Sequence, residues 1–196
     1  MKHILLPLPF LLLLCASGPA AAHTEVGVAG GLLSGFFHPL TGLDHLVAMV
    51  AVGLWGAQLG PPGIWVLPIC FQTVMAVGGL LGIAGVPLPL TELVIAASAL
   101  VLGFAVATAL RVPFWAAAIT VGIFAVFHGY AHGLELPDAA NPLAYGIGFV
   151  VATGMLHALG ILVGVLTRWR TGAQAVRVLG AAIAGLGGMF MISLAP

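Results

Sequence analysis

Hydrophobic residues follow one another along most of this chain, and short stretches rich in proline, glycine or arginine interrupt them. Each uninterrupted block is about 20 residues or longer, the length that a helix needs to cross a bilayer. The pattern therefore predicts an all-α fold, a polytopic transmembrane helical bundle with six spans. We expect the helices at about residues 28–58, 63–85, 91–110, 113–133, 142–167 and 174–194.

The first of these helices is too long for a single span and contains Pro39 and Gly42. Proline removes a backbone hydrogen bond and clashes with the preceding turn. Membrane helices tolerate such a break where the freed backbone lines a cavity. We therefore expect this helix to be kinked or broken between Pro39 and Gly42, and a re-entrant first segment is the alternative.

The chain begins with Lys2, an apolar run over residues 4–15 and the small residues Ala20-Ala21-Ala22. A charged start, a short apolar region and an A-x-A site are typical of a secretory signal peptide. We predict that residues 1–22 are removed, which leaves residues 23–196 as a single transmembrane domain beginning at His23. The alternative is an uncleaved anchor helix, although about 12 apolar residues are few for a span.

Composition narrows the class of protein further. Of the 196 residues, 62% are hydrophobic and 5% are charged, so the lipid bilayer is the expected environment. The net charge is zero and basic runs are absent, which argues against a nucleic-acid partner. The sequence has no G-x-x-x-x-G-K-[ST] motif, so we expect no ATP hydrolysis by this chain.

The arginines predict the orientation of the bundle. If the mature N-terminus lies outside, six spans put two arginine-bearing connections inside and the acidic connections outside. The inner connections then carry Arg111, Arg168, Arg170 and Arg177, and the outer ones carry Glu92, Glu135 and Asp138. This arrangement agrees with the positive-inside pattern of membrane proteins.

One group of candidate ligands lies near the end of the fourth predicted helix. His128 and His132 are four residues apart and share a helical face, and Glu135 returns to nearly the same face. Two imidazoles and a carboxylate form a donor set that suits a divalent transition metal. The alternative is a pair of histidines that only form hydrogen bonds to neighbouring helices.

A second group, His38, Asp44 and His45, surrounds the predicted break. Adjacent residues diverge by about 100° on a regular helix, so Asp44 and His45 need the break in order to converge. A central Asp costs roughly 2.5–3.5 kcal/mol to insert, which favours a functional role. The alternative is a structural kink, with His38 capping freed backbone and Asp44 orienting an imidazole. Both groups are expected in the outer half of the membrane.

Three further features allow two interpretations each. His157, with Thr153 on its face, is either an inner relay ligand or a buried histidine bonded to that threonine. His23 would offer an amino group and an imidazole to a metal, or would merely tolerate cleavage. Gly160 and Gly164 have the spacing of a dimer face and make a homo-oligomer a candidate, although glycine is common throughout this chain.

The chain resembles the HupE/UreJ family of nickel and cobalt permeases in two motifs: His38-Pro39-x-x-Gly42-x-Asp44-His45 and Phe127-His128-Gly129-x-Ala131-His132-Gly133-x-Glu135. The resemblance implies a multi-pass protein of the bacterial inner membrane that takes up metal, with Ni²⁺ or Co²⁺ as transported substrate and no permanently bound cofactor. It implies an essential set: His38, Asp44, His45, His128, His132 and Glu135.

The sequence therefore allows three hypotheses about function. The first is a secondary transporter for nickel, or cobalt, without enzymatic activity, because imidazoles suit these ions while Mg²⁺ and Ca²⁺ prefer oxygen ligands. The second is a membrane-embedded zinc-dependent hydrolase, for which Ser34 lies four residues before His38. The third is an assembly protein whose polar residues only hold helices together.

Overall fold

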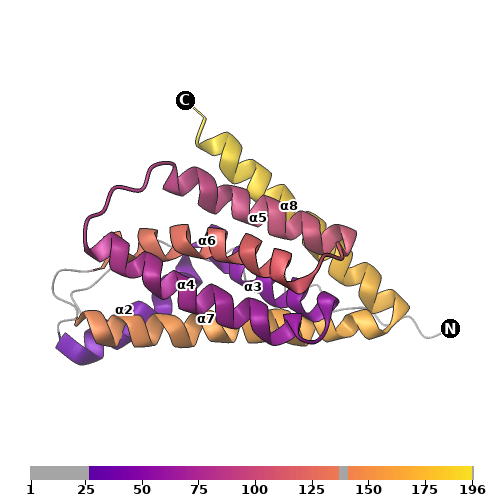
Figure 1. Cartoon of the computed structure of the whole chain (residues 1–196), viewed down its shortest axis with the longest axis horizontal. Coiled ribbons are helices and arrows are strands. Elements are labelled where there is room, and N and C mark those ends of the chain that lie inside the picture. The colour runs from indigo at the N-terminus through magenta and orange to yellow at the C-terminus, as the bar shows by residue number, and fades with distance from the viewer. Residues whose placement is uncertain (1–26, 137–140, 196) are drawn as a thin grey trace.

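A computed structural model describes residues 27–136 and 141–195 of the chain, so the predicted signal peptide and His23 lie outside the described residues. Helices are the regular elements of this part, which confirms the all-α prediction (Figure 1). They are α2 (Gly27–Thr41), α3 (Leu43–Leu59), α4 (Gly63–Ile83), α5 (Thr91–Thr108), α6 (Phe114–Leu134), α7 (Pro142–Gly164), the short 3-10 helix η2 (Val165–Arg168) and α8 (Arg170–Ser193).

The number of spans agrees with the sequence prediction when the first two helices are taken together. Five helices of the described chain are long and apolar enough to cross a membrane. The α2–α3 pair passes the same test as a unit and is bent by 82°, which makes up to six spans. The expected break in the first predicted helix is therefore confirmed.

The break falls at Gly42, directly after the turn that contains Pro39. Gly42 has an extended backbone, with φ −83° and ψ 106°, and its carbonyl oxygen accepts the first hydrogen bond of α3 from the Leu46 amide. A Cβ atom on Gly42 would lie 3.2 Å from Nδ1 of His45 and 3.3 Å from Oδ1 of Asp44. The absence of a side chain at Gly42 therefore lets both polar residues fold back over the break.

Close helix packing holds α6, which carries the second histidine motif, within the bundle. The most extensive contacts are those of α4 with α6, α5 with α8, and both α2 and α3 with α7. A Cβ atom on Gly129 of α6 would collide with the backbone carbonyl of Met75, and one on Gly78 of α4 would collide with that of Val126. Glycines thus allow the backbones of α4 and α6 to touch, as small residues do between membrane helices.

The predicted dimer face on α7 is wrong. Gly160 packs against the backbone of Val50 and Gly53 in α3, and Gly164 packs against Ala57 of the same helix. The two glycines therefore serve packing within one chain and are not available to a second copy. Association of copies through another surface stays a prediction.

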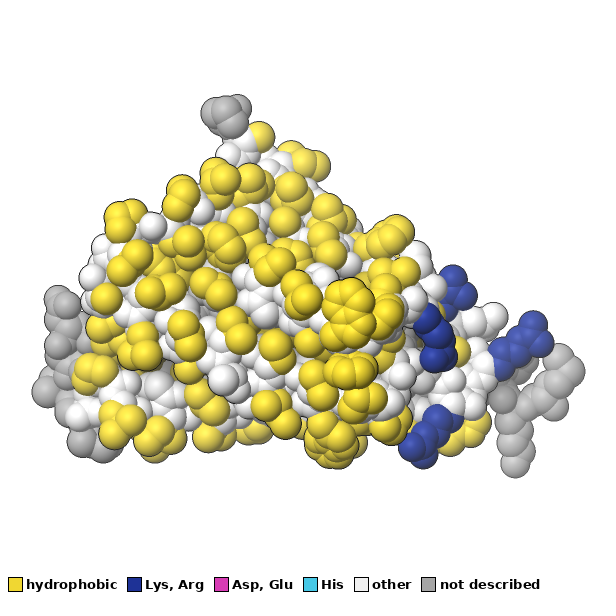
Figure 2. All heavy atoms as spheres, in the orientation of Figure 1, with side chains coloured by type: hydrophobic (Ala, Val, Ile, Leu, Met, Phe, Trp, Pro, Cys, Tyr) yellow, Lys and Arg dark blue, Asp and Glu magenta, His cyan; other side chains and the backbone are white. Residues whose placement is uncertain are grey.

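The molecular surface has the character expected in lipid. Hydrophobic side chains cover the face in Figure 2, and basic side chains gather at one end. The basic residues of the described chain are all exposed: Arg111, Arg168, Arg170 and Arg177. Figure 1 places the C-terminal end of α6, which Glu135 follows, at the opposite end of the bundle. The arginines and Glu135 thus lie apart, as the sidedness prediction requires.

Candidate metal centre

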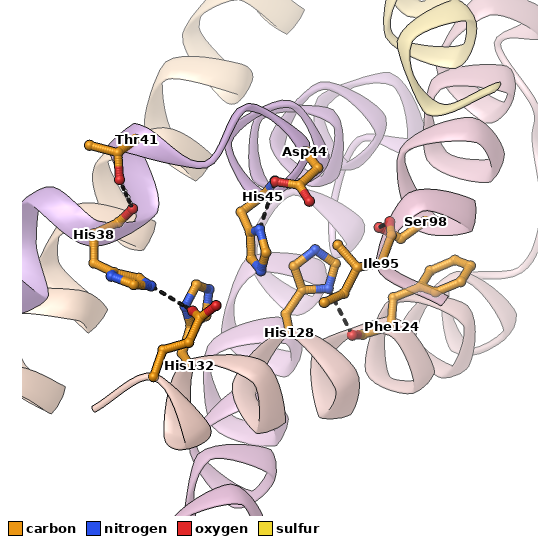
Figure 3. A network of polar contacts seen from close by, with 10 residues as sticks. His38, Thr41, Asp44, His45, Ile95, Ser98, Phe124, His128 and His132 are labelled. Carbon is orange, nitrogen blue, oxygen red and sulfur yellow. Dashed lines mark hydrogen bonds and ion pairs between the residues drawn. The ribbon is translucent and has the colours of Figure 1, made fainter. Parts of the chain in front are cut away.

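The two histidine motifs meet inside the bundle. The ring centre of His45, on α3, lies 4.3 Å from that of His132 and 4.9 Å from that of His128, both on α6. Figure 3 shows these imidazoles turned toward one another across the space between the helices. The predicted convergence of two separate segments is therefore observed.

The exposed end of this cluster consists of His38, His132 and Glu135, one ligand atom of each lying within 4.8 Å of the others. Nε2 of His38 lies 2.8 Å from Oε2 of Glu135, a hydrogen bond between α2 and the end of α6. Nδ1 of His132 lies 3.6 Å from the same oxygen, which is beyond hydrogen-bond distance. Two nitrogens and one carboxylate thus lie close enough together to be candidate ligands of one transition-metal ion.

Glu135 caps the C-terminal end of α6 and is half-exposed. The His132 and His38 imidazoles beside it hold the pKa of its carboxyl well below its ordinary value. A lowered pKa means that the carboxylate stays ionised as the pH falls through the range where a carboxyl ordinarily takes up its proton. Glu135 therefore presents a negative charge at the exposed end of the cluster.

His45 and His128 form the part of the cluster away from Glu135, called the deep part below, and each has one ring nitrogen fixed by a partner. Nδ1 of His128 lies 2.9 Å from the carbonyl oxygen of Phe124. A carbonyl can only accept, so this nitrogen carries the proton. Nδ1 of His45 likewise donates to Oδ1 of Asp44 at 2.9 Å. In both rings Nε2 is left with its lone pair, and it is buried without a partner among the described residues.

Asp44 acts on His45 and does not join the group of facing donor atoms. Its Oδ1 accepts both from the His45 backbone amide, at 2.9 Å, and from the ring. This matches the orienting role that the sequence analysis had left as an alternative. A carboxylate that holds the far nitrogen of a histidine is the usual outer partner of a metal-binding imidazole.

His132 connects the exposed and deep parts of the cluster. Its ring centre lies 4.8 Å from that of His38 and 4.3 Å from that of His45. It is 5% exposed, and neither ring nitrogen has a hydrogen-bond partner in the part of the chain that the structure describes. An unpaired buried polar group costs about 1–3 kcal/mol, so this arrangement favours a role for His132 beyond packing.

His157 lies apart from this cluster. Phe71 of α4 lies between them, with its ring centre 5.4 Å from that of His128 and 5.2 Å from that of His157. The hydroxyl of Thr153 has no hydrogen-bond partner in residues 27–136 and 141–195, so the alternative of a histidine bonded to that threonine is wrong. The interpretation of His157 as a relay ligand stays a prediction. His23 falls outside the described residues.

Aromatic residues around the cluster were missed by the sequence analysis. Phe149 of α7 lies 4.2 Å from His132 between ring centres, and Tyr145, one turn earlier, lies 5.9 Å from His38. Both are 5% exposed. Their spacing of four residues, which continues to Thr153 and His157, is a signal in the sequence. That spacing identifies a helical face, but not what the face contacts.

Comparison with known proteins gives consistent results. A family model described as HupE / UreJ protein matches residues 11–190. The chain is 46% identical over 175 residues to Protein HupE of Rhizobium leguminosarum bv. viciae, a match that covers 89% of this chain and 92% of that protein. No solved structure matches the chain. The matched region includes the whole α2–α7 bundle and both histidine motifs.

Proposed function

Since the chain belongs to the HupE/UreJ family, we propose that it is a secondary transporter that takes divalent nickel into the cell, with cobalt as the next candidate substrate. The observation that carries this proposal is the row of imidazoles from His38 through His132 and His45 to His128. The row begins at the exposed carboxylate of Glu135 and ends at a fully buried ring, as an entry route for a cation would.

The donor atoms suit this substrate. Imidazole nitrogens bind nickel and cobalt well, whereas Mg²⁺ and Ca²⁺ require shells of oxygen atoms. His38, His132 and Glu135 replace part of the hydration shell at the exposed end. The lone pairs on Nε2 of His45 and His128 then receive the ion at depth.

The spacing of the rings supports movement as well as binding. His132 neighbours both His38 and His45, so one ligand is shared between the exposed and deep positions. An ion that exchanges one ligand at a time avoids full rehydration inside the bundle. Conduction needs several positions of moderate strength, because a single very tight site would retain the ion.

The structure adds no support for the hydrolase alternative through Ser34, the serine four residues before His38. Oγ of Ser34 donates a hydrogen bond to the carbonyl oxygen of Gly31 in its own helix, at 3.2 Å. Such a local bond is ordinary for a serine in a helix and links Ser34 to none of the histidines. Cleavage of an amide or ester by the purified chain, dependent on zinc, would favour the hydrolase over the transporter.

Uptake of radioactive nickel by cells that produce this chain alone tests the proposal. We expect accumulation that cobalt reduces and magnesium does not. His128→Ala should abolish it while the protein stays in the membrane, because the deepest ligand is lost. Ser98→Ala is the matched control, since Ser98 is equally buried but bonds only to Ile95 of its own helix. Undiminished accumulation in His128→Ala would refute the site.

A further inference from the structure

His157 is a buried candidate ligand that lies outside the metal centre. It is 1% exposed, and both ring nitrogens lack a hydrogen-bond partner among the residues that the structure describes. The hydroxyl of Thr153, one turn earlier on α7, is fully buried and equally unpartnered. Two unpaired polar groups on one helical face at membrane depth are costly.

The N-terminal part of the same face of α7 contacts the metal centre. Tyr145, Phe149, Thr153 and His157 follow at intervals of four residues, and all are buried. The first two contact His38 and His132, as described above. On the other side, the ring of Phe71 contacts both His128 and His157. One aromatic ring therefore separates His128 from His157.

The position of His157 along the bundle fits a later step. It follows Tyr145 by 12 residues, which is about 18 Å along α7. It precedes exposed Arg168 by 11 residues, or about 18 Å, since the last four of these form the 3-10 helix η2. His157 thus lies roughly halfway between the end of the bundle that holds Glu135 and the end that holds the arginines.

Residues of α3 pack beside His157. The backbone of Gly53 meets the carbonyl oxygen of His157, and Met49, fully buried, shares the face of Gly53 one turn earlier. Gly160 meets Val50 and Gly53, and Gly164 meets Ala57, so the two helices run in the same direction. Met49 is therefore on the Thr153 side of this contact, where its thioether can assist a borderline metal.

We propose that His157 and Thr153 form a second metal-binding position, which receives the ion from the metal centre before its release. The position takes a divalent cation of the nickel class, through one imidazole nitrogen and one hydroxyl oxygen. With fewer nitrogen donors than the metal centre and no carboxylate, it binds more weakly, as release requires. This inference rests on the proposed transport function and deepens it.

Equilibrium binding of nickel alone to the purified full chain tests the second position directly. We expect two ions per chain with different affinities, one in the metal centre, whose exposed and deep positions share His132, and one at His157. His157→Gln should lose the weaker ion and keep the tighter one, and His128→Gln should weaken the tighter one. Two ions with unchanged affinities in His157→Gln would overturn the proposal.

Uptake kinetics separate this proposal from the transport function itself. We expect His157→Gln to lower the maximal rate about tenfold or more while the half-saturating nickel concentration stays unchanged, because capture occurs at His38, His132 and Glu135. Leu156→Ala is the packing control, since Leu156 is the buried neighbour of His157 on a different face. An equal loss of rate in Leu156→Ala, or none in His157→Gln, would overturn the second position.

Thr153→Val provides an independent variant that keeps the shape of the side chain. It should weaken the second ion and leave the amount of folded protein unchanged, even if His157→Gln folds poorly. Unaltered binding of the second ion in Thr153→Val would remove the threonine from the site. Failure of the unmodified chain to accumulate nickel would instead contradict the proposed function.

Discussion

The imidazoles of His45 and His128 have the same nitrogen free, but different kinds of partner fix the other nitrogen. Phe124 fixes Nδ1 of His128 through a backbone carbonyl, which a substitution of the Phe124 side chain would leave in place. Asp44 fixes Nδ1 of His45 through a carboxylate, which a substitution can remove. A substitution of Asp44 therefore tests the orientation of the His45 ring without removing an imidazole from the metal centre.

We expect Asp44→Ala to raise the half-saturating nickel concentration for uptake by about 10–100-fold, the usual cost of losing such an outer partner. The His45 ring would then turn freely and its Nε2 would face the other imidazoles only part of the time. Asp44→Asn keeps an acceptor oxygen and should lose less. Uptake measured over a range of nickel concentrations checks this, and equal defects in both variants would assign Asp44 to the metal itself.

Pairs of helices determine how closely the ligands approach. Gly129 lies directly after His128, and its position against the Met75 carbonyl sets the distance between α4 and α6. Gly129→Ala would force these backbones apart, and overpacking of this kind typically costs about 1–3 kcal/mol. We expect a lower thermal unfolding midpoint in detergent and lower nickel uptake.

Gly146→Ala is the matched control for this prediction, because a Cβ atom at Gly146 meets nothing within 4 Å. Both variants add the same methyl group to a membrane helix. An unfolding midpoint that falls equally in the two variants would show that the backbone contact between α4 and α6 is not the cause.

Sequence patterns predicted these elements unevenly. Pro39 and Gly42 indicated the break because their backbone chemistry is local. The 82° bend was not predictable, since its direction depends on how α2 and α3 pack on α7. The role of Gly160 was misassigned for a related reason, because the spacing of glycines marks a close contact without identifying the partner helix.

The metal centre was likewise predicted only in part. His128 and His132 share a face by their spacing alone, so their pairing needed only helix geometry. Their meeting with His45 depended on two segments far apart in the chain, and the cost of polar groups in lipid justified that prediction. Phe71 gave no such signal, because one apolar residue in an apolar helix is not distinctive.

At the scale of the whole molecule, the two ends of the bundle differ in charge. Glu135 marks the end where the imidazole row begins, and the exposed arginines of the described chain mark the other. If arginines face the cytoplasm, as in most membrane proteins, the row opens to the side from which the metal arrives. The orientation of the bundle therefore decides from which side of the membrane an ion first meets the row.

Thiol labelling in spheroplasts tests this orientation. In a chain with Cys70→Ala and Cys15→Ala, we expect Ala139→Cys, in the sequence between α6 and α7, to react with a membrane-impermeant maleimide. Thr171→Cys, exposed beside Arg170, should react only after the membrane is permeabilised. The reverse labelling would place the row of imidazoles on the cytoplasmic side, where the same ligands would suit export. Nickel uptake by each cysteine variant confirms that the labelled protein is the functional one.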